Sequence, residues 1–406
     1  MTDFNHPNRA IDALAERLLR RETHQLESDQ LVGRVLASDV LADRDSPAAD
    51  VSAMDGYAIR LSDFGSRSAV PIAGECVAGE APPPMIPNAV LRIFTGAVVP
   101  DGCEAVVKRE DTIEHEHSIE FLSSARNASP GEHIRRAGEN AKTNDCVLAA
   151  GSLVTPASIA TMVNFGSYSA NVFDQVRVSL ITTGNEVDRF EQESPRPWQL
   201  RNSNAAAIES MLRSIASVRF IDHHHCRDDR FSLAESLEKC LSESDAVFLT
   251  GGVSQGDYDY VPKIIPGFGA EIVFHGLPIR PGKPILGAAT RAGKLILGLP
   301  GNPVSATVGA RRFARPLLAK MSGQNDWREH PPQVRLHDSA SKSLPLHVMR
   351  LVRHVENSFE QGKENAVVAA VPSLGSGDLV SLGQSIGFVE IPPGHSGEGP
   401  WPFFAW

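Results

Sequence analysis

The segment from Leu297 to Ala306, Leu-Gly-Leu-Pro-Gly-Asn-Pro-Val-Ser-Ala, constrains the fold more than any other part of the chain. An apolar strand runs through a Gly/Pro turn directly into a predicted helix start. Asn302 is a favoured N-cap there, and Pro303 occupies the first helical position, where its missing N–H costs nothing. Gly298 and Gly301 allow a ligand to approach the backbone closely, and the free N–H groups of a helix start favour an anion. One Gly-Asn-Pro alone would also fit an ordinary βα turn.

Two more glycine-rich loops lie in the same part of the chain, at Gly251–Gly256 and Pro281–Pro284. From about residue 176, predicted strands and helices alternate, which is typical of a mainly parallel sheet covered on both faces. Ligands bind such sheets at the carboxyl ends of the strands, where all three loops fall. The predicted strands are Val176–Ile181, Val218–Asp222, Ala246–Thr250, Glu271–Phe274 and Leu295–Leu299, and the predicted helices are Ala205–Arg213, Phe231–Leu241 and Pro303–Ala319.

The rest of the chain predicts three further parts. Apolar periodicity indicates helices over Ala10–Arg20 and from Thr155 to a stop at Gly166. Short apolar runs between turns indicate a small β unit, and similar runs after residue 326 indicate a C-terminal β domain. We therefore expect a multidomain α/β and β protein with a doubly wound, mainly parallel α/β domain. The predicted domains are residues 1–50 plus 136–175 (helical linker), 51–135 (inserted β domain), 176–325 (α/β) and 326–406 (β-barrel-like).

Composition excludes several classes of protein. The net charge of −10 over 406 residues argues against nucleic acid or an acidic membrane surface as the main partner. No apolar run approaches the roughly 20 residues that span a bilayer, and the first residues lack the pattern of a signal peptide. The five cysteines show no C-x-x-C spacing, which disfavours a disulfide framework or a structural zinc site. We expect a soluble, cytoplasmic protein.

Carboxylates accompany the glycines at the predicted strand ends. Glu186 follows the first strand, and Asp257 and Asp259 follow the Gly251–Gly256 loop, while Asp228 precedes a helix. Hard Mg²⁺ takes oxygen ligands and bridges phosphates, so these side chains suit a magnesium site. Any one of them would also fit a solvated loop or, for Asp228, an N-cap. At the same edge, Arg280 and Lys283 would complement a second anion.

Two competing motifs are weaker. His223–His225 resembles a metal-binding tract but falls where a strand is predicted to end, which favours a surface turn. Gly252–Gly256 fits the G-x-S-x-G elbow of α/β-hydrolases, with Ser254 as nucleophile. That elbow opens directly into a helix, whereas acidic residues and Pro262 follow here. The remaining triad members, Asp338 and His347 or His354, would also have to come from the C-terminal β domain.

Seven motifs, in order, resemble the molybdopterin molybdenumtransferases, whose eukaryotic relatives include gephyrin. The C-terminal domain matches weakly, mainly at Gly375-Ser376. The resemblance implies ligation of molybdate into adenylylated molybdopterin with Mg²⁺, releasing AMP and molybdenum cofactor. The matching segments are Ser52–Ala58, Ile93–Ala97, Thr183–Glu186, Gly251–Ser254, Gly256–Asp259, Arg280–Pro284 and Leu299–Ala306.

The resemblance also implies roles for individual residues. The implied catalytic residues are Asp55, Glu186, Asp228 and Asp259, of which Glu186 and Asp259 would hold Mg²⁺. The implied molybdate-binding residues are Arg280, Lys283, Arg350 and Ser376, with Arg353 as an alternative to Arg350. The implied substrate-binding residues are Thr95, Gly184, Gly251, Gly252, Ser254, Asp257, Pro300, Gly301, Asn302 and Ser305.

The chain departs from the family pattern at two positions. Gly276 stands where some members carry a second lysine, and Asn185 stands where many carry aspartate, so anion affinity is expected to differ. The resemblance further implies a homodimer with clefts built from both chains, and the molybdopterin adenylyltransferase is a candidate partner. The alternatives to the transferase are a non-catalytic pterin-binding scaffold and a phosphate-ester hydrolase with the same α/β domain.

Overall fold

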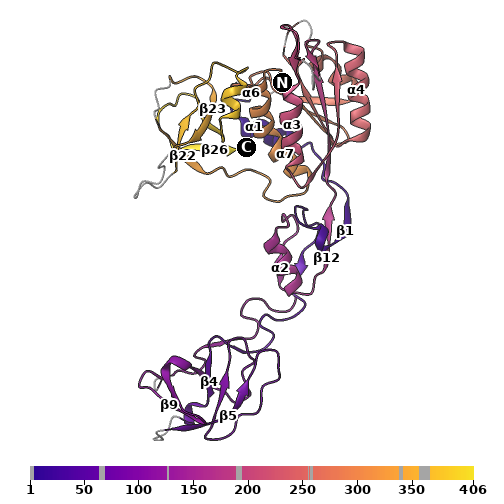
Figure 1. Cartoon of the computed structure of the whole chain (residues 1–406). Coiled ribbons are helices and arrows are strands. Elements are labelled where there is room, and N and C mark those ends of the chain that lie inside the picture. The colour runs from indigo at the N-terminus through magenta and orange to yellow at the C-terminus, as the bar shows by residue number, and fades with distance from the viewer. Residues whose placement is uncertain are drawn as a thin grey trace. The chain divides into compact units, whose positions relative to one another are not determined.

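The computed structural model describes residues 4–63, 69–125, 128–188, 194–254, 256, 259–337, 342–355 and 366–406. The chain forms two compact units (Figure 1). The first unit comprises Met1–Ser38, Ala150–Ile159 and Ser169–Trp406, and the second comprises Asp39–Ala149 and Ala160–Tyr168. The division into four domains at the bounds given above remains a prediction. In the described part of the chain, no helix has the length and apolar character needed to cross a membrane.

A six-stranded sheet in the first unit has the order β16-β13-β17-β21-β20-β18. Its first four strands run parallel to their neighbours, and the last two pair antiparallel, which confirms the mainly parallel α/β sheet. The strand β20 was not predicted from the sequence. The bounds are β13 Val176–Thr183, β16 Val218–Cys226, β17 Ala246–Thr250, β18 Ala270–His275, β20 Leu286–Thr290 and β21 Leu295–Leu299.

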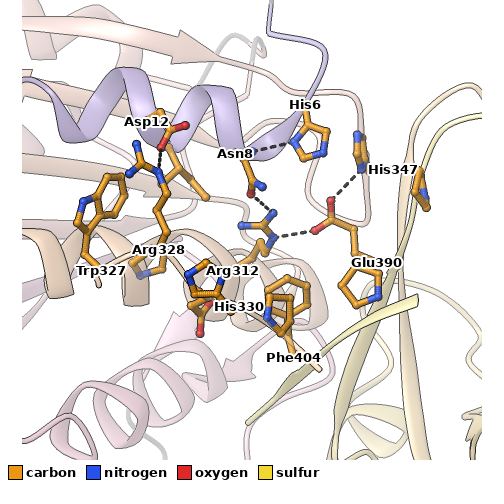
Figure 2. Close-up of a pocket in the computed structure, with 16 residues that line it drawn as sticks. His6, Asn8, Asp12, Arg312, Trp327, Arg328, His330, His347, Glu390 and Phe404 are labelled. Atoms are coloured by element: carbon orange, nitrogen blue, oxygen red, sulfur yellow. Dashed lines mark hydrogen bonds and ion pairs between the residues drawn. The ribbon is translucent and has the colours of Figure 1, made fainter. Parts of the chain in front are cut away.

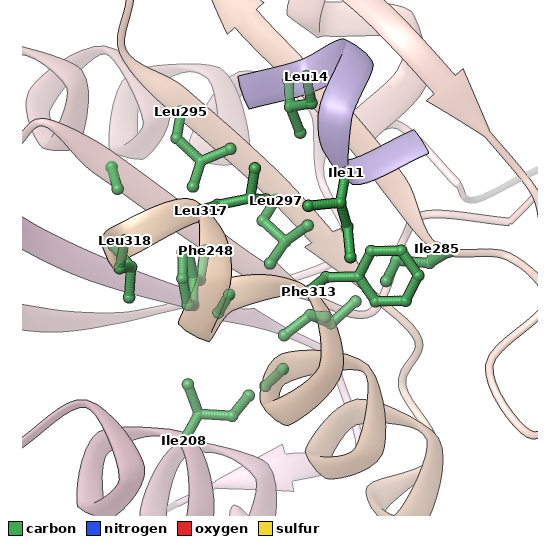
Figure 3. Close-up of a cluster of buried hydrophobic side chains, with 14 of the residues drawn as sticks. Ile11, Leu14, Ile208, Phe248, Ile285, Leu295, Leu297, Phe313, Leu317 and Leu318 are labelled. Atoms are coloured by element: carbon green, nitrogen blue, oxygen red, sulfur yellow. The ribbon is translucent and has the colours of Figure 1, made fainter. Parts of the chain in front are cut away.

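Alternate residues of the central strands pack into two separate cores. On β17, Phe248 belongs to the core that also contains residues of helices α1, α3, α6 and α7, whereas Val247 and Leu249 belong to the core with α4 and α5 (Figures 1 and 3). Both faces of the sheet are therefore covered, as expected for doubly wound folds. The helices are α1 Pro7–Ala15, α3 Ser203–Arg213, α4 Arg230–Glu243, α5 Val261–Ile264, α6 Pro303–Gly309 and α7 Arg315–Met321.

Several local predictions need correction. The predicted helix over Pro303–Ala319 contains a π-helical turn, Ala310–Ala314, between α6 and α7. Asp229, not Asp228, is the N-cap of α4, because its side chain accepts a hydrogen bond from the N–H of Ser232. The histidines at 223–225 are not in a turn, since pairing with β13 extends β16 through Cys226.

The C-terminal strands close into a barrel in the order β23-β24-β22-β26-β25, with β25 returning to pair with β23. This closure confirms the predicted β-barrel-like domain. The short strand β19, Ile279–Arg280, adds to β23 in parallel. The other elements are β22 Gln333–His337, β23 His347–His354, β24 Val367–Ala370, α8 Leu379–Gly383, β25 Gly387–Ile391 and β26 Trp401–Ala405.

The second unit contains a six-stranded sheet of order β7-β4-β6-β5-β9-β8 and two short strand pairs, β3 with β10 and β2 with β11. Buried side chains on the two faces of β4, Tyr57 and Ala58, belong to separate small cores. The strands are β2 Val40–Leu41, β3 Val51–Ser52, β4 Gly56–Ile59, β5 Val70–Cys76, β6 Val90–Ile93, β7 Ala105–Lys108, β8 Thr112–Glu114, β9 Ser118–Phe121, β10 Ile134–Arg135 and β11 Cys146–Leu148.

The helix predicted from Thr155 is confirmed as α2, Pro156–Asn164. The Thr155 hydroxyl accepts a hydrogen bond from the Ser158 N–H at 3.2 Å, as an N-cap does. Met162 and Phe165 are buried, whereas Val163 is exposed. The remaining strand pairs are β1 Thr23–Glu27 with β12 Ser169–Phe173, and β14 Val187–Asp188 with β15 Leu200–Arg201.

Candidate functional site

Three loops meet at the carboxyl edge of the α/β sheet. The Gly251 N–H donates to the carbonyl of Leu299 at 3.1 Å, which joins the loop after β17 to the end of β21. Gly251 has a φ of +85°, and a Cβ there would lie 2.5 Å from the Thr183 Oγ1. A Cβ on Gly301 would lie 3.7 Å from the Gly251 Cα. Only glycine fits at position 251, because the loops after β13, β17 and β21 pack directly against one another there.

A fourth loop, residues 276–285, reaches the same edge because β20 runs antiparallel to β21. Leu286 at the start of β20 pairs with Gly298 near the end of β21. Within this loop Gly282 has a φ of +103°, and a Cβ there would lie 3.7 Å from the Ser305 carbonyl oxygen. The Arg280 and Lys283 side chains are exposed and take no hydrogen bond or ion pair among the described residues. This edge therefore carries two unpaired cations.

The barrel contributes a fifth loop. The Val304 N–H at the start of α6 donates to the Ser376 carbonyl at 3.0 Å, which places the 375–376 turn against the helix start. On the adjoining strands, Arg280 lies opposite Val348. Arg350 is two residues further along β23 and so shares that face, whereas Arg353 lies on the other face. The strand register thus places Arg350, and not Arg353, on the face that Arg280 shares.

The loop after β13 presents Glu186 in an open position. A Cβ on Gly184, which has a φ of +138°, would lie 3.0 Å from the Glu186 Oε1, so the carboxylate lies over the glycine backbone. The Glu186 carboxylate takes no hydrogen bond or ion pair among the described residues. Its neighbour Asn185 exchanges two hydrogen bonds with Asp228, at 3.2 and 3.3 Å. Asn185 therefore holds Asp228 in place through its backbone N–H and its side-chain oxygen.

The Asp259 carboxylate closes the loop after β17. Its Oδ2 accepts a hydrogen bond from the Gly256 N–H at 2.7 Å, and its other oxygen has no partner among the described residues. Asp257 lies outside the described residues. Ser254 is exposed, but the next helix, α5, begins only at Val261, so the described residues do not form a strand-to-helix nucleophile elbow. The geometry therefore argues against an α/β-hydrolase with Ser254 as its nucleophile.

Sequence reasoning missed two asparagines at the start of α3. Asn204 Nδ2 donates to the Gly301 carbonyl at 2.7 Å. Asn202 caps α3 with its Oδ1 and donates from Nδ2 to the Thr182 hydroxyl at 2.8 Å. His223 also contacts this hydroxyl, at 2.8 Å. The signal that could have found them is an Asn-Ser-Asn triplet opening a helix beside a glycine-rich turn. Asn302 is the N-cap residue of α6, with Pro303 at the first helical position as predicted, but its side chain makes no capping hydrogen bond.

Asp55 and Thr95 belong to the second unit. The Thr95 N–H and hydroxyl both donate to the Asp55 Oδ1, each at 2.7 Å. These two hydrogen bonds, the backbone one first, hold the pKa of the Asp55 carboxyl below its usual value. The Asp55 side chain is exposed, and the described geometry keeps it ionised and fixed.

A separate cavity of about 320 Å³ lies between α1, the π-helical turn and the barrel (Figure 2). Arg312 Nε contacts the Glu390 carboxylate at 2.7 Å, and His347 Nδ1 lies 2.8 Å from the other oxygen. Burial raises the pKa of Glu390, but Arg312 and His347 outweigh it and lower the pKa to about 2.

His6, His347 and Glu390 could supply metal-ligand atoms, which lie within 4.8 Å of one another. However, the His6 Nδ1 already accepts the Asn8 N–H as the cap of α1, and Arg312 occupies the carboxylate. Arg312 connects α1 to the barrel, because it donates to Asn8 on α1 and to Glu390 on β25.

Comparisons with known proteins match most of the chain to proteins of molybdopterin metabolism. Residues 6–166 match the MoeA N-terminal region (domain I and II), and residues 179–320 match a probable molybdopterin binding domain. A molybdopterin molybdenumtransferase from Synechococcus elongatus is 36% identical over 76% of this chain and 77% of its own length. One from Nostoc is 30% identical over 90% and 84%. The crystal structure of the molybdopterin biosynthesis moeA protein from Pyrococcus horikoshii OT3 superposes with a TM-score of 0.80 at 25% identity, covering 100% of both chains.

Proposed function

Because this chain belongs to the molybdopterin molybdenumtransferase family, we propose that it ligates molybdate into adenylylated molybdopterin with Mg²⁺, releasing AMP and molybdenum cofactor. The observation that carries the proposal is the meeting of five loops at one edge of the α/β sheet. These loops bring a free carboxylate, Glu186, to the same edge as two unpaired cations, Arg280 and Lys283. A protein that only carried the pterin would have no need of both the carboxylate and the cations.

The reacting groups are anions, and the loops suit them. Glycines at 251, 282 and 301 let the backbone and a ligand approach each other closely. Arg280 and Lys283, with Arg350 on the same face as Arg280, would hold the molybdate dianion by charge-assisted hydrogen bonds. These contacts would place the oxyanion beside the pterin dithiolene.

The carboxylates at this edge fit a magnesium ion. Glu186 offers both oxygens, and Asp259 offers the one that the Gly256 N–H does not engage. Oxygen donors of this kind are what Mg²⁺ prefers, together with water and substrate phosphates. When bound, the ion would supply charge neutralisation at the phosphoanhydride. Asp228, held by Asn185, would orient water or a ligand for cleavage of that bond.

We propose that Asp55 completes the cleft of a neighbouring chain in a homodimer. Asp55 is ionised, exposed and fixed by Thr95. The loops of the proposed site, however, belong to the other unit of the chain. A shared cleft would give it a role and would require two-fold symmetry. The molybdopterin adenylyltransferase, which makes the adenylylated substrate, would be the natural partner for transfer.

The direct test is incubation of the purified protein with adenylylated molybdopterin, molybdate and Mg²⁺. The proposal expects AMP and active molybdenum cofactor to appear together and to need all three additions. Cofactor-dependent reconstitution of an apo-molybdoenzyme detects the product. Bound pterin that is never converted, with no AMP above background, would instead identify a scaffold.

A further inference from the structure

A hollow of about 660 Å³ adjoins the loop that carries Lys283. Its wall is formed by the segment before and within α1 and by the turn after β18. Gly276 contributes no side chain to it and has a φ of +84°. The lining residues are Phe4, Asn5, Arg9, His275, Gly276, Leu277, Pro278 and Lys283.

Among the described residues, two cations and no carboxylate line this hollow. The Arg9 and Lys283 side chains are both exposed, and neither takes a hydrogen bond or ion pair among the described residues. The third basic group, His275, is engaged, because its Nε2 donates to the Val253 carbonyl at 2.7 Å. Unpaired cations that share a concave surface raise the local concentration of anions. The chemistry of the hollow is therefore that of an anion site.

A folded segment holds Arg9 in the wall of the hollow that Lys283 also lines. The ring of Phe4 meets the edge of Phe274 on β18, with centroids 6.4 Å apart, which anchors the chain just before α1. Neighbouring residues of α1, Ala10 and Ile11, are buried in the main core. The backbone that carries Arg9 is thus fixed while its side chain remains free to reach an anion.

We infer that Arg9 is an oxyanion-binding residue, which together with Lys283 receives molybdate in this hollow. A tetrahedral dianion needs more than one positive partner, and a guanidinium offers paired N–H donors to two of its oxygens. Arg9 lies some 270 residues before the Lys283 loop, so no sequence motif links the two. The identity of the anion as molybdate rests on the proposed function.

The test is calorimetric titration of molybdate into the full-length protein without pterin, beside turnover at varied molybdate. Arg9→Gln should weaken molybdate binding by about tenfold and raise the molybdate KM similarly, with kcat nearly unchanged. Arg9→Lys should recover part of the loss. Arg291→Gln, which removes an exposed arginine at the opposite edge of the sheet, is the matched control and should bind as the unaltered protein does.

The outcomes separate this inference from the proposed function. Arg9→Gln protein that binds molybdate and shows the same KM as the unaltered protein would overturn the role of Arg9 and leave the transferase proposal intact. An unaltered protein that does not bind molybdate in the titration would also overturn it. Arg9-dependent binding without turnover would sustain the anion site and count against the transferase.

Discussion

The Val304 N–H donates a hydrogen bond to the Ser376 carbonyl at 3.0 Å, which joins the first turn of α6 to a loop of the C-terminal barrel. The loop is itself closed, because the Asp378 carboxylate accepts the Leu374 N–H at 3.0 Å. An orphan donor of the helix start is thereby satisfied by a partner 72 residues away in the sequence. The barrel therefore helps to shape the edge at which the proposed chemistry takes place.

The carboxylates at that edge should be essential for turnover but not for folding. Glu186→Gln and Asp259→Asn keep size and hydrogen-bonding shape while removing charge, so AMP release should fall by at least about a hundredfold. Circular dichroism should stay unchanged. Glu238→Gln, an exposed change on α4, is the matched control. Turnover near normal in both amide variants at limiting Mg²⁺ would mean that these carboxylates are structural.

Lys283→Ala should affect molybdate far more than the pterin nucleotide. Loss of one charge-assisted contact is worth roughly 1.5–3 kcal/mol, which corresponds to about a ten- to hundredfold rise in the molybdate needed. Kinetics at varied molybdate, with fluorescence titration of the pterin substrate, measure the two effects separately. Lys239→Ala on α4 serves as the control. If nucleotide binding collapsed while the molybdate dependence stayed unchanged, the Lys283 loop would bind the pterin nucleotide and not molybdate.

Thr95→Ala should shift the acid limb of the pH–rate profile upward. The Thr95 hydrogen bonds lower the Asp55 pKa, so the carboxylate stays charged to lower pH than usual. The substitution removes the hydroxyl donor and leaves the backbone donor, so the Asp55 pKa should rise part of the way. We expect kcat/KM to decline at a higher pH than in the unaltered protein. Thr112→Ala, in the same unit, is the control and should leave the pH–rate profile unchanged. An acid limb that stays at the same pH in Thr95→Ala would show that ionisation of Asp55 does not control catalysis.

The buried pair of Arg312 and Glu390 should be a major contributor to stability. Glu390→Gln leaves Arg312 buried without a counter-charge, a change that costs about 3–5 kcal/mol. The pKa of Glu390 is lowered from 4.5 to about 2, so its contribution is complete above pH 4.5 and is lost as the pH falls through 2. Thermal unfolding should show a large gap between the two proteins at pH 7 that narrows in acid.

The control for this pair is Glu271→Gln, which breaks an exposed ion pair with Arg17 and should barely change the unfolding midpoint. Equal midpoints for all three proteins at pH 7 would show that the Arg312 network is dispensable.

Local signals in the sequence predicted the α/β sheet and the glycine-rich loops well. The turn at Leu297–Ala306 was predicted because strand, turn and helix start are encoded within ten residues. The strand β20 was missed, since Leu-Gly-Ala-Ala-Thr has little β-propensity and is held by its two neighbours. Asn302 is the N-cap of α6 as predicted, but the Val304 N–H takes the Ser376 carbonyl, a partner that no local pattern reveals.

The candidate site was predicted unevenly for the same reason. Glu186 follows β13 closely and Asp259 follows the glycine-rich loop after β17, so topology alone predicted that they lie at one edge. The register that selects Arg350 over Arg353 depends on β19 pairing with β23, which joins segments about 70 residues apart. No sequence pattern marked Arg9 as a site residue, because the packing of α1 on the sheet brings it to the hollow that Lys283 also lines.

A mixture of two inactive variants tests the shared cleft. Asp55→Asn and Glu186→Gln chains, co-expressed with different tags and purified as a heterodimer, should regain up to half of the normal turnover per dimer, because one of the two clefts would be intact. Each homodimer alone should stay inactive. A confirmed heterodimer without activity would mean that each site is built within one chain.

The most direct measurement of the central claim is the molar ratio of AMP released to active molybdenum cofactor formed, in a single turnover with excess protein. The account predicts a ratio near one that requires both Mg²⁺ and molybdate, and its loss in Glu186→Gln protein. AMP released at the full rate without molybdate, and with no cofactor formed, would contradict the account and identify a hydrolase of the adenylylated substrate.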